Sequence, residues 1–584
     1  MSLYNDASLV MIPSAYKDGK LYSIKPTDGS GDFTFSRGSN LAATRVDVNG
    51  LIEKGRENQI LQSNSFDTTW TSFGITLTSG QSGYDGSSDA WLVNKTSGIA
   101  YQGLRQTIST TGVQTTSFYA KAGTLSTIAL YISGGSHPYV LINLTNGTLI
   151  SQRGTEIDVN IEDVGNGWYR ISFAFNETSS AYWIYPDWSG TNNGNIYIQD
   201  AQLEVGLVAT DYIETTTTTA QAGILEDMPR LDYSGGASCP SLLLEPSRTN
   251  LFTNSEYFDG TPYTQSYITL TANAAISPEG VQNAYLFVPT TDNDVHRNIS
   301  FLSITNGISA TISFFAKANG YNYPFLRTNL TGSYENYFFD LVNETTNDSD
   351  ATIEDYGNGW YRCILTKTTA TTSIGIGFGI SNDGINIVFS GDGTSGIYFY
   401  GTQLEEGSYP TSYIPCYGAA TTRSDDFNNQ NDLISTPYVF DANDNFTFMY
   451  EGSFFDDGIS NMICGGGSAS LGSTGKSYWW LQTNSNRIRL YGDGELIMGS
   501  ANYTYPTVNT NGKYLVRKAD GVIDFFVNGT KLTTTQGTPN LRFDLRSAFW
   551  SYNPSAYTVS GRAKQFLVFE TALTDSEAIA LTTI

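Results

Sequence analysis

One ten-residue stretch of this chain occurs twice. Residues 161–170 read IEDVGNGWYR and residues 353–362 read IEDYGNGWYR, so nine of the ten positions are identical. In the first copy Gly165 and Gly167 flank Asn166, and these residue types accept the positive φ angles that a tight hairpin turn needs. The stretch therefore predicts a β-hairpin turn that leads into a strand, present in each of two copies of one domain.

Further matches extend the repeat on both sides of this hairpin. In chain order they pair residues 117–123 with 313–319, residues 195–206 with 396–407, and residues 211–213 with 412–414. The blocks occur in the same order in both copies, and the offset between copies changes slightly, as loop insertions would cause. Because two copies are too few to build a solenoid, the pattern indicates tandem domains.

Composition and patterning favour an all-β fold. Aromatic residues make up 13% of the chain, which also contains 58 glycines, whereas amphipathic helical patterns are scarce. Short alternating runs, such as residues 523–528, are separated by clusters of Asn, Gly, Asp and Ser, which is typical of many short strands joined by turns. A chain of 584 residues is long enough for several domains that each bury a core. We therefore predict three β-sandwich (jelly-roll) domains in series after a short N-terminal attachment segment.

The domain boundaries follow from the repeat and from changes in pattern. The predicted parts are residues 1–56 as the attachment segment, 57–218 and 249–421 as the repeated sandwiches, 219–248 as a connector, and 422–584 as a third sandwich. Residues 1–56 are too few to bury a core of their own. We expect this segment either to pack on the first sandwich or, as the preferred alternative, to dock on another protein.

Charge and residue counts argue against several classes of function. The formal net charge is −25, from 31 basic and 56 acidic residues, and the sequence has no basic cluster that would neutralise a nucleic-acid backbone. Two histidines and four widely spaced cysteines argue against zinc chemistry and a disulfide framework. The start of the chain lacks a signal-peptide pattern, and no apolar stretch is long enough to span a membrane. We expect a protein made in a cytoplasm, with no nucleic-acid partner and no membrane insertion.

An aromatic stretch in the first repeat is the main candidate for a binding site. Trp183, Tyr185 and Trp188 lie within a few residues of one another, whereas the matching residues 373–380 of the second repeat are poor in large aromatic side chains. Aromatic rings bind the apolar face of a sugar ring, and a few polar groups fix its hydroxyls. We predict that these three residues bind glycan; the alternative is that they pack in the core.

A second candidate lies in the third sandwich. Consecutive residues of a strand point to opposite faces, so one of Trp479 and Trp480 belongs to the core and the other faces outward. We take Trp480 as the outward residue and predict that Tyr491 and Asn502 join it in a glycan-binding site.

A glycan-degrading enzyme is the alternative from a different class. Retaining glycosidases need two carboxylates about 5–5.5 Å apart, and inverting enzymes about 6.5–9.5 Å. In the run of Glu156, Asp158 and Glu162, echoed in the second repeat from Asp348 and Asp350, the outer pair would lie roughly 20 Å apart along an extended strand. Glu156 and Asp158 would be about 7 Å apart, which leaves an inverting pair open, the alternative being a solvated face beside a turn. We assign no catalytic residues and expect no enzyme.

Several segments resemble virion fibre proteins of tailed bacteriophages, with the greatest likeness to those of crAss-like and related phages of Bacteroidetes hosts. The segments are residues 1–14, 35–38, 43–46 and 241–251. The repeated domain is similar to the carbohydrate-binding-module-like jelly rolls of phage head and tail fibres. The last domain, with residues 527–529 and 572–577, is similar to concanavalin-like (laminin-G-type) domains.

The resemblance implies a structural protein of the virion surface, assembled in the bacterial host cytoplasm. It implies either a head fibre or a tail fibre, attached to phage capsid or tail proteins through residues 1–56. It also implies a homo-oligomer, with a trimer favoured, that binds surface glycans, because repetition of weak sites raises the overall affinity. A glycan depolymerase acting on host surface polysaccharide is the alternative function.

The same resemblance raises the question of calcium, which is common in β-sandwich modules of this kind. Oxygen-rich loops at Asp456 and Asp457, or at Asp441, Asn443 and Asp444, contain the ligand types that calcium prefers. The sequence has no EF-hand pattern, and we expect no other cofactor.

Overall fold

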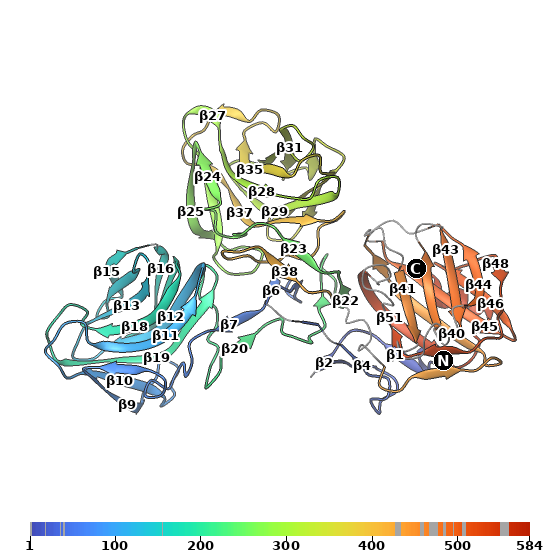
Figure 1. The fold of residues 1–584 in the computed structure, drawn as a ribbon, viewed down its shortest axis with the longest axis horizontal. Helices are drawn as coiled ribbons and strands as arrows, with labels where there is room; N and C mark the ends of the chain where they lie inside the picture. Colours follow the sequence, from blue (N-terminus) through green and yellow to red (C-terminus); the bar gives the residue numbers. More distant parts are fainter. Residues whose placement is uncertain are drawn as a thin grey trace.

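A computed structural model of the protein describes most of the chain. The described residues are 3–17, 19–35, 37–38, 41–154, 156–426, 434–455, 461–466, 477–482, 486–493, 496–504, 510–548 and 560–584. They form three β-sandwiches around an extended central region (Figure 1), and the predicted all-β class is confirmed. Within these ranges, no helix is long and apolar enough to cross a membrane.

The first sandwich consists of two six-stranded antiparallel sheets. One sheet has the order β16 (Glu156–Gly165), β17 (Trp168–Asn176), β12 (Val113–Ala122), β19 (Gly194–Val205), β10 (Ala90–Lys95), β9 (Ile75–Gln81). The other has the order β15 (Thr148–Arg153), β14 (Tyr139–Asn143), β13 (Thr127–Gly134), β18 (Ser179–Pro186), β11 (Gly103–Thr110), β8 (Thr71–Phe73). Residues in the strands alternate between the core and the outer surface, as in Val140 and Ile142, which are buried, and Tyr139, which is not.

The second sandwich repeats this topology. Its first sheet has the order β33 (Ala351–Asp355), β34 (Tyr361–Thr368), β29 (Ser309–Asn319), β37 (Gly396–Glu406), β26 (Ala284–Pro289), β25 (Ile268–Ala275). Its second sheet has the order β32 (Thr345–Thr346), β31 (Glu335–Asp340), β30 (Tyr323–Thr328), β35 (Ser373–Ser381), β28 (Arg297–Ser303), β24 (Tyr263–Ser266). The repeated hairpin occupies the same position in both, between β16 and β17 and between β33 and β34, so the sequence repeat is also a repeat of the fold.

The repeat extends to hydrogen bonds between buried side chains. Gln202 donates to Glu204 at 2.6 Å in the first sandwich, and Gln403 donates to Glu405 at 2.7 Å in the second. All four side chains are buried, where an unpaired polar group would be costly. The pairs explain why the sequence Gln-Leu-Glu occurs in both copies.

The third sandwich also has two main sheets. The first has the order β21 (Leu231–Asp232), β22 (Ser241–Leu244), β51 (Gly561–Phe569), β40 (Phe446–Phe454), β45 (Gly512–Ala519), β46 (Val522–Val527), β47 (Thr530–Lys531), and β1 (Leu9–Met11) also pairs with β51. The second has the order β48 (Thr534–Gln536), β44 (Leu496–Asn502), β43 (Arg487–Gly492), β42 (Ser477–Gln482), β41 (Asn461–Gly466), β50 (Ser547–Ala548). Helix α1 (Asp575–Thr582) closes the chain, and its capping box is formed by Thr574 and Glu577.

Short strands and one 3-10 turn complete the fold. They are η1 (Leu3–Asn5), the sheet of β2 (Tyr16–Lys17), β3 (Lys20–Leu21) and β4 (Phe33–Thr34), and the pairs β5 (Thr44–Val46) with β6 (Ile52–Lys54), β7 (Arg56–Asn58) with β20 (Ala220–Ala222), β23 (Arg248–Asn250) with β38 (Thr421–Arg423), β27 (Asn293–Val295) with β36 (Val388–Ser390), and β39 (Tyr438–Phe440) with β49 (Phe543–Leu545).

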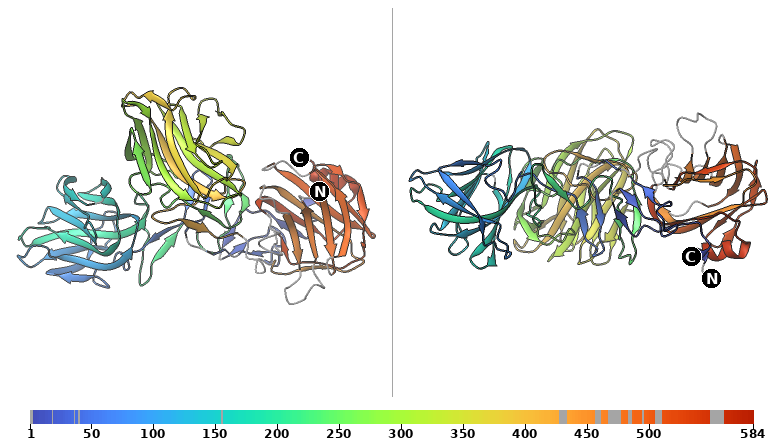
Figure 2. Two further views of the ribbon diagram at one scale, coloured as in Figure 1. Left: turned by 45° about the horizontal axis from the view of Figure 1, so that its top comes forward. Right: turned by 90° about the horizontal axis from the view of Figure 1, so that it is seen from below.

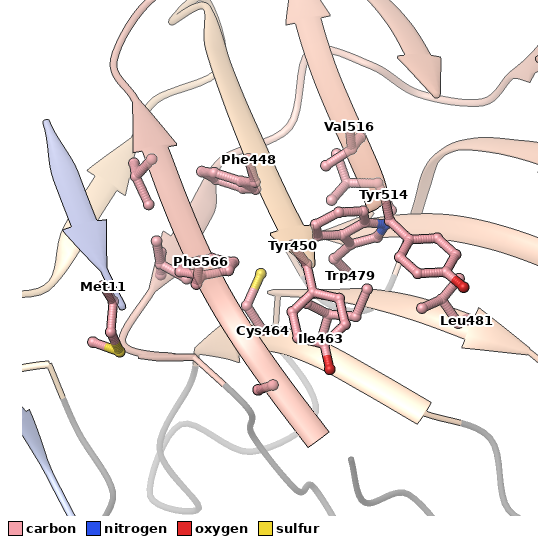
Figure 3. Packing of buried hydrophobic residues seen from close by; sticks show 14 of the residues in the cluster. Met11, Phe448, Tyr450, Ile463, Cys464, Trp479, Leu481, Tyr514, Val516 and Phe566 are labelled. Atoms are coloured by element: carbon pink, nitrogen blue, oxygen red, sulfur yellow. The ribbon is translucent and has the colours of Figure 1, made fainter. Parts of the chain in front are cut away.

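The N-terminal residues pack on the third sandwich, which neither sequence expectation anticipated. Leu9, Val10 and Met11 pair with Val568, Leu567 and Phe566 of β51, and the two ends of the chain lie close together (Figure 2). Leu9 and Met11 are fully buried in the core of the third sandwich, where Met11 lies beside Phe566 (Figure 3). Packing on the first sandwich is therefore wrong, and attachment of residues 1–56 to another protein stays a prediction.

The predicted connector, residues 219–248, is likewise part of a sheet. Leu242, Leu243 and Leu244 of β22 pair with Ala563, Arg562 and Gly561 of β51. On the side of β51 away from β40, β22 therefore pairs with its first residues and β1 pairs with residues near its end. Covering an edge in this way removes unpaired backbone groups that would otherwise be open to other chains.

Candidate functional site

β18 alternates between the core and the outer surface of the first sandwich. Tyr182 and Ile184 are fully buried in the core cluster, whereas Trp183 and Tyr185 lie on the opposite face of the sheet and outside that cluster. The Trp183 and Tyr185 rings stack with their centroids 5.2 Å apart and their planes 8° from parallel. Both residues that were predicted on this strand therefore belong to its outer face.

Three aromatic residues form a row across the outer face of this sheet. Tyr131 of β13 is directly opposite Tyr139 of β14 on one side and Trp183 of β18 on the other. Side chains directly opposite each other on neighbouring strands lie about 5 Å apart and share a face. Trp188, just beyond β18, stacks on Tyr139 with centroids 5.0 Å apart and contacts Tyr185 edge-on at 5.0 Å. The structure thus brings Trp183, Tyr185 and Trp188 into one surface.

Two further rings extend this surface. Phe73 of β8 lies 5.3 Å from Trp183, and Tyr101 lies 5.5 Å from Trp188, measured between ring centroids. Phe73 is 38% exposed and Tyr101 is 56% exposed, so the surface opens to solvent at both of these positions. We call this surface the aromatic face; it consists of Phe73, Tyr101, Tyr131, Tyr139, Trp183, Tyr185 and Trp188.

Sequence reasoning missed Tyr131 and Tyr139. A signal was present, because Ile128, Leu130 and Ile132 alternate along one strand and are fully buried, which directs Tyr131 to the other face. What the sequence does not contain is the register that sets Tyr131 between Tyr139 and Trp183, since register depends on the pairing of strands in the folded sheet.

Polar groups surround the aromatic face. The Trp183 indole Nε1 donates to Ser133 Oγ at 3.1 Å, and Tyr131 Oη and His137 Nδ1 share a hydrogen bond of 2.8 Å. The guanidinium groups of Arg105 and Arg153 lie 5.5 Å from the ring centroids of Trp183 and Tyr139 respectively. The face therefore combines ring surfaces with hydrogen-bonding groups at its margins.

The corresponding strand of the second sandwich carries glycines on its outer face. Gly375 and Gly379 alternate with buried residues along β35, and Phe378 points into the core. A Cβ atom at Gly379 would lie 2.4 Å from the Phe325 ring, and one at Gly375 would lie 2.3 Å from the Tyr334 hydroxyl. Rings from neighbouring strands therefore cover the strand, and it has no row of rings like the one in the first sandwich.

The candidate site of the third sandwich is brought together only in part. Trp479 is fully buried and Trp480 lies on the opposite, outer face. The Trp480 and Tyr491 ring centroids lie 5.8 Å apart, but Tyr491 is only 7% exposed. Asn502 is exposed and is paired with Arg487 rather than with Trp480 or Tyr491. Tyr185 of the aromatic face is equally buried, so the difference between the two sites is that only two of the three residues in the third sandwich contact one another.

Of the two acidic residues that were weighed as an inverting pair, Asp158 makes a contact of another kind, and the Glu156 side chain lies outside the described part of the structure. Asp158 accepts a hydrogen bond from Asn273 of the second sandwich at 2.7 Å. In the second repeat, Lys367 Nζ lies 2.9 Å from Asp348 and 2.7 Å from Asp350. Asp158 thus contributes to the contact between the first two sandwiches, and Asp348 and Asp350 form a surface ion pair with Lys367.

The oxygen-rich loop at Asp441, Asn443 and Asp444 forms a hydrogen bond within itself. Asp444 accepts a hydrogen bond from the backbone amide of Asp441 at 2.7 Å, so its carboxylate caps its own turn. In the described ranges, no group of three or more His, Cys, Asp or Glu side chains is arranged to hold a metal ion. The other loop considered, Asp456 and Asp457, lies outside the described residues.

A cavity of about 670 Å³ lies between the first and second sandwiches. Lys54, Arg56, Gly112 and Tyr417 are among its lining residues. The Lys54 ammonium group lies 2.7 Å from Glu256 and donates a hydrogen bond to Tyr417 Oη at 2.8 Å. Because these groups satisfy one another, the cavity is a less convincing ligand site than the aromatic face.

Asp200 of the first sandwich provides a pH-dependent contribution to stability. Burial raises the pKa of Asp200 to about 7, and the negative charges of Asp89 and Asp85 act in the same direction, against the hydrogen bond from Tyr84. Between pH 3.8 and about 7 the folded protein keeps a proton on Asp200 that the unfolded chain has released. The contribution of Asp200 to the free energy of unfolding is therefore greatest at low pH and is lost as pH rises through about 7.

We expect the free energy of unfolding of the first sandwich to fall by about 2 kcal/mol between pH 5 and pH 7 because of this one group. Denaturant unfolding followed through the range should show the fall in the natural protein and lose it in Asp200→Asn. The exposed Asp67→Asn serves as the control and should keep the pH dependence. An unchanged profile in Asp200→Asn would contradict the assignment.

No protein-family model and no curated protein sequence matches the chain. Among solved structures, similarity is found to a tandem CBM22 domain of Xyn10C from Paenibacillus barcinonensis, with 11% identity, a TM-score of 0.21, and coverage of 64% of this chain and 100% of that one. Tailspike protein 4 of bacteriophage CBA120 has 14% identity, a TM-score of 0.19, and coverage of 26% and 21%. The LG1-3 region of the laminin alpha2 chain has 10% identity, a TM-score of 0.17, and coverage of 80% and 96%. At such low TM-scores we take no functional conclusion from these similarities.

Proposed function

We propose that the protein is a non-enzymatic fibre of a tailed-phage virion, and that the aromatic face of its first sandwich binds surface glycans. The observation that supports glycan binding is the row of Tyr139, Tyr131 and Trp183, held in register on the outer face of one sheet. Neighbouring strands set these rings at a spacing of about 4.8 Å, and aromatic rings provide apolar surface against which the apolar faces of linked sugar rings can pack.

The polar groups around the rings suit the same ligand. Sugar binding needs hydrogen bonds to hydroxyl groups as well as apolar contact; His137 and Ser133 lie beside the rings, and Tyr131, the middle ring, carries a hydroxyl of its own. The face is preformed by β13, β14 and β18, so little ordering is needed when a ligand binds. Repetition of the site in a homo-oligomer, for which we favour a trimer, would raise the overall affinity for a surface that carries many copies of the glycan.

The virion part of the proposal rests on the resemblance of residues 1–14, 35–38, 43–46 and 241–251 to phage fibres. The net charge of −25 suits a protein that must stay soluble at high local concentration. A density map of the assembled particle tests this part. Density that fits three sandwiches at the capsid supports a head fibre, density at the tail supports a tail fibre, and its absence from the particle contradicts the virion role.

Substitutions on the aromatic face test glycan binding. We expect Trp183→Ala and Tyr131→Ala each to weaken binding to the best glycan of an array of bacterial surface oligosaccharides by about tenfold, which corresponds to about 1.4 kcal/mol. Calorimetry or biolayer interferometry with the full chain measures the loss. Phe301→Ala, which removes a 62% exposed ring from the second sandwich, is the matched control and should bind normally.

The outcome that contradicts the proposal is also defined. If Trp183→Ala and Tyr131→Ala bind as well as the natural protein, the aromatic face is not the glycan site. The proposal further expects the glycan to be recovered intact, without new reducing ends, after long incubation with the protein. Released fragments would favour a glycan depolymerase instead.

A further inference from the structure

The aromatic face ends in an arginine on each side. Arg153 of β15 is directly opposite Tyr139, and Arg105 of β11 is directly opposite Trp183. The row is therefore continuous across five neighbouring strands, and it reads Arg153, Tyr139, Tyr131, Trp183, Arg105. Four strand spacings of about 4.8 Å place the two arginines roughly 19 Å apart.

Resting on the proposed function, we propose that the aromatic face binds acidic oligosaccharides, and that Arg105 and Arg153 hold carboxylates of the sugar units. A guanidinium group suits this role because its planar fork of N–H donors matches a carboxylate in a two-bonded pair, and because it also stacks on aromatic rings. Both arginines already lie over rings of the row, at 5.5 Å from the centroids.

Neither arginine has a carboxylate partner among the residues that the structure describes. No ion pair between described residues involves Arg105 or Arg153, although the chain has 56 acidic residues for 31 basic ones and some buried arginines are paired with acids, as Arg230 is with Glu245. Arg105 Nε is buried and has no hydrogen-bond acceptor in the described structure. Arg153 donates only to the backbone carbonyl oxygen of His137, at 3.3 Å. A ligand carboxylate would supply the missing acceptor.

Two acidic side chains close to the face in the described structure are occupied elsewhere. Asp187, next to Trp188, lies 3.4 Å from Lys95 Nζ and accepts from the backbone amide of Asn192 at 3.1 Å. Glu177, between β17 and β18, accepts from the Ser136 backbone amide at 2.8 Å. These carboxylates therefore do not neutralise Arg105 or Arg153, and the row keeps a positive charge at both ends in a protein that is otherwise acidic.

The spacing of the arginines sets the size of the ligand. A single sugar unit can reach only one guanidinium, whereas a chain of several acidic units laid along the row can reach both. The inferred ligand is accordingly a short acidic polysaccharide segment, and its two charged contacts lie on either side of the stacked rings.

A matched pair of glycans tests the charge. Hexasaccharides of a uronic acid, such as galacturonate or guluronate, are compared with the same hexasaccharides after reduction of their carboxyl groups to neutral alcohols, using the full chain and calorimetry at 50 mM and 300 mM salt. We expect the acidic form to bind at least tenfold more tightly than the reduced form at low salt, and its advantage to shrink at high salt. A sulfated oligosaccharide of similar length is included as a second acidic probe.

Substitutions then assign the contact to these residues. Arg105→Gln should weaken binding of the acidic hexasaccharide about tenfold and weaken binding of the reduced form much less, and Arg153→Gln should have a smaller effect on the acidic form because Arg153 is exposed. Arg105→Lys should keep part of the salt dependence of binding but should bind the acidic hexasaccharide more weakly than the natural protein does. Arg297→Gln in the second sandwich is the matched control, and thermal unfolding confirms that each variant is folded.

The outcomes separate this inference from the proposed function. Equal binding of acidic and reduced glycans that Trp183→Ala abolishes would leave glycan binding in place and overturn the role of the charge. Binding of the sulfated probe alone would overturn the assignment to carboxylates. A lack of binding to acidic and neutral glycans alike would overturn both the inference and the proposed function.

Discussion

Deletion of residues 1–35 is expected to unfold the third sandwich and to leave the first sandwich folded. Five side chains of this segment belong to the core of the third sandwich, each no more than 2% exposed: Leu9, Met11, Leu21, Phe33 and Phe35. Truncating one such side chain to alanine costs about 2–5 kcal/mol, and a whole domain is stable by only about 5–15 kcal/mol. Loss of all five together therefore exceeds what the third sandwich can lose.

Single substitutions provide the graded test of the same contact. Leu9→Ala and Met11→Ala should each lower the free energy of unfolding of the third sandwich by about 3 kcal/mol. Ile24→Ala removes an apolar side chain of the same segment that is 48% exposed, so it should cost less than about 0.5 kcal/mol. Hydrogen exchange reports the result directly through protection of β40 and β51.

A protein without residues 1–35 that keeps native exchange protection in β51 would contradict this account. It would mean that the three paired residues of β1 add little to a sheet that is already stable. The consequence for function would be different as well, because the segment would then be free to leave the third sandwich and attach to another protein. If the segment is as firmly packed as we expect, attachment must use its outer surface.

The sequence repeat predicted the first two sandwiches because the repeated residues determine local turns and strands. The glycine turns, the Gln-Leu-Glu strand and the Trp-Tyr-Arg strand each follow from local chemistry that one chain segment holds on its own. The packing of β1 on β51 could not be predicted in this way. A three-residue strand with every residue buried has no alternation, and it carries no information on which distant strand covers it.

The candidate site likewise has features that the sequence predicts and features that it does not. Trp183 and Tyr185 could be predicted to share one face of β18 once it was recognised as a strand, because alternate residues share a face, although Tyr185 is covered by its neighbours to 7% exposure. Arg105 comes from another strand, and only the register of β11 with β18 places it beside Trp183. The sequence also could not show that the second repeat fills its glycine-lined strand with Phe325 from a neighbouring strand.

Arg230 joins three parts of the chain, and its removal is the second large effect that we expect. Its fully buried guanidinium donates to Glu245 at 2.8 Å and to Asp426 at 3.0 Å, and to the backbone carbonyl oxygen of Thr44 at 2.9 Å. Arg423 also lies 2.8 Å from Glu245, and the pKa of Glu245 is held well below its ordinary value, because these two arginines and the hydrogen bonds from Ser412 outweigh the effect of burial.

Arg230→Met would leave Glu245 and Asp426 buried, each without one of its arginine partners. Breaking one side of a buried ion pair costs about 3–5 kcal/mol, so we expect a loss of this size, measured by calorimetry of the full chain as a shift of the transition that reports the central region. The control is Arg542→Ala. The Arg542 side chain is 51% exposed in its pair with Asp544, so this substitution should cost less than about 1 kcal/mol.

Because the pKa of Glu245 is lowered in the folded protein, the contribution of this network is present at neutral pH and is lost as pH falls through that lowered value. An Arg230→Met protein as stable as the natural one would show that the cost of burying these charges cancels their attraction, and that Arg230 serves to fix the relative position of the sandwiches rather than to stabilise them.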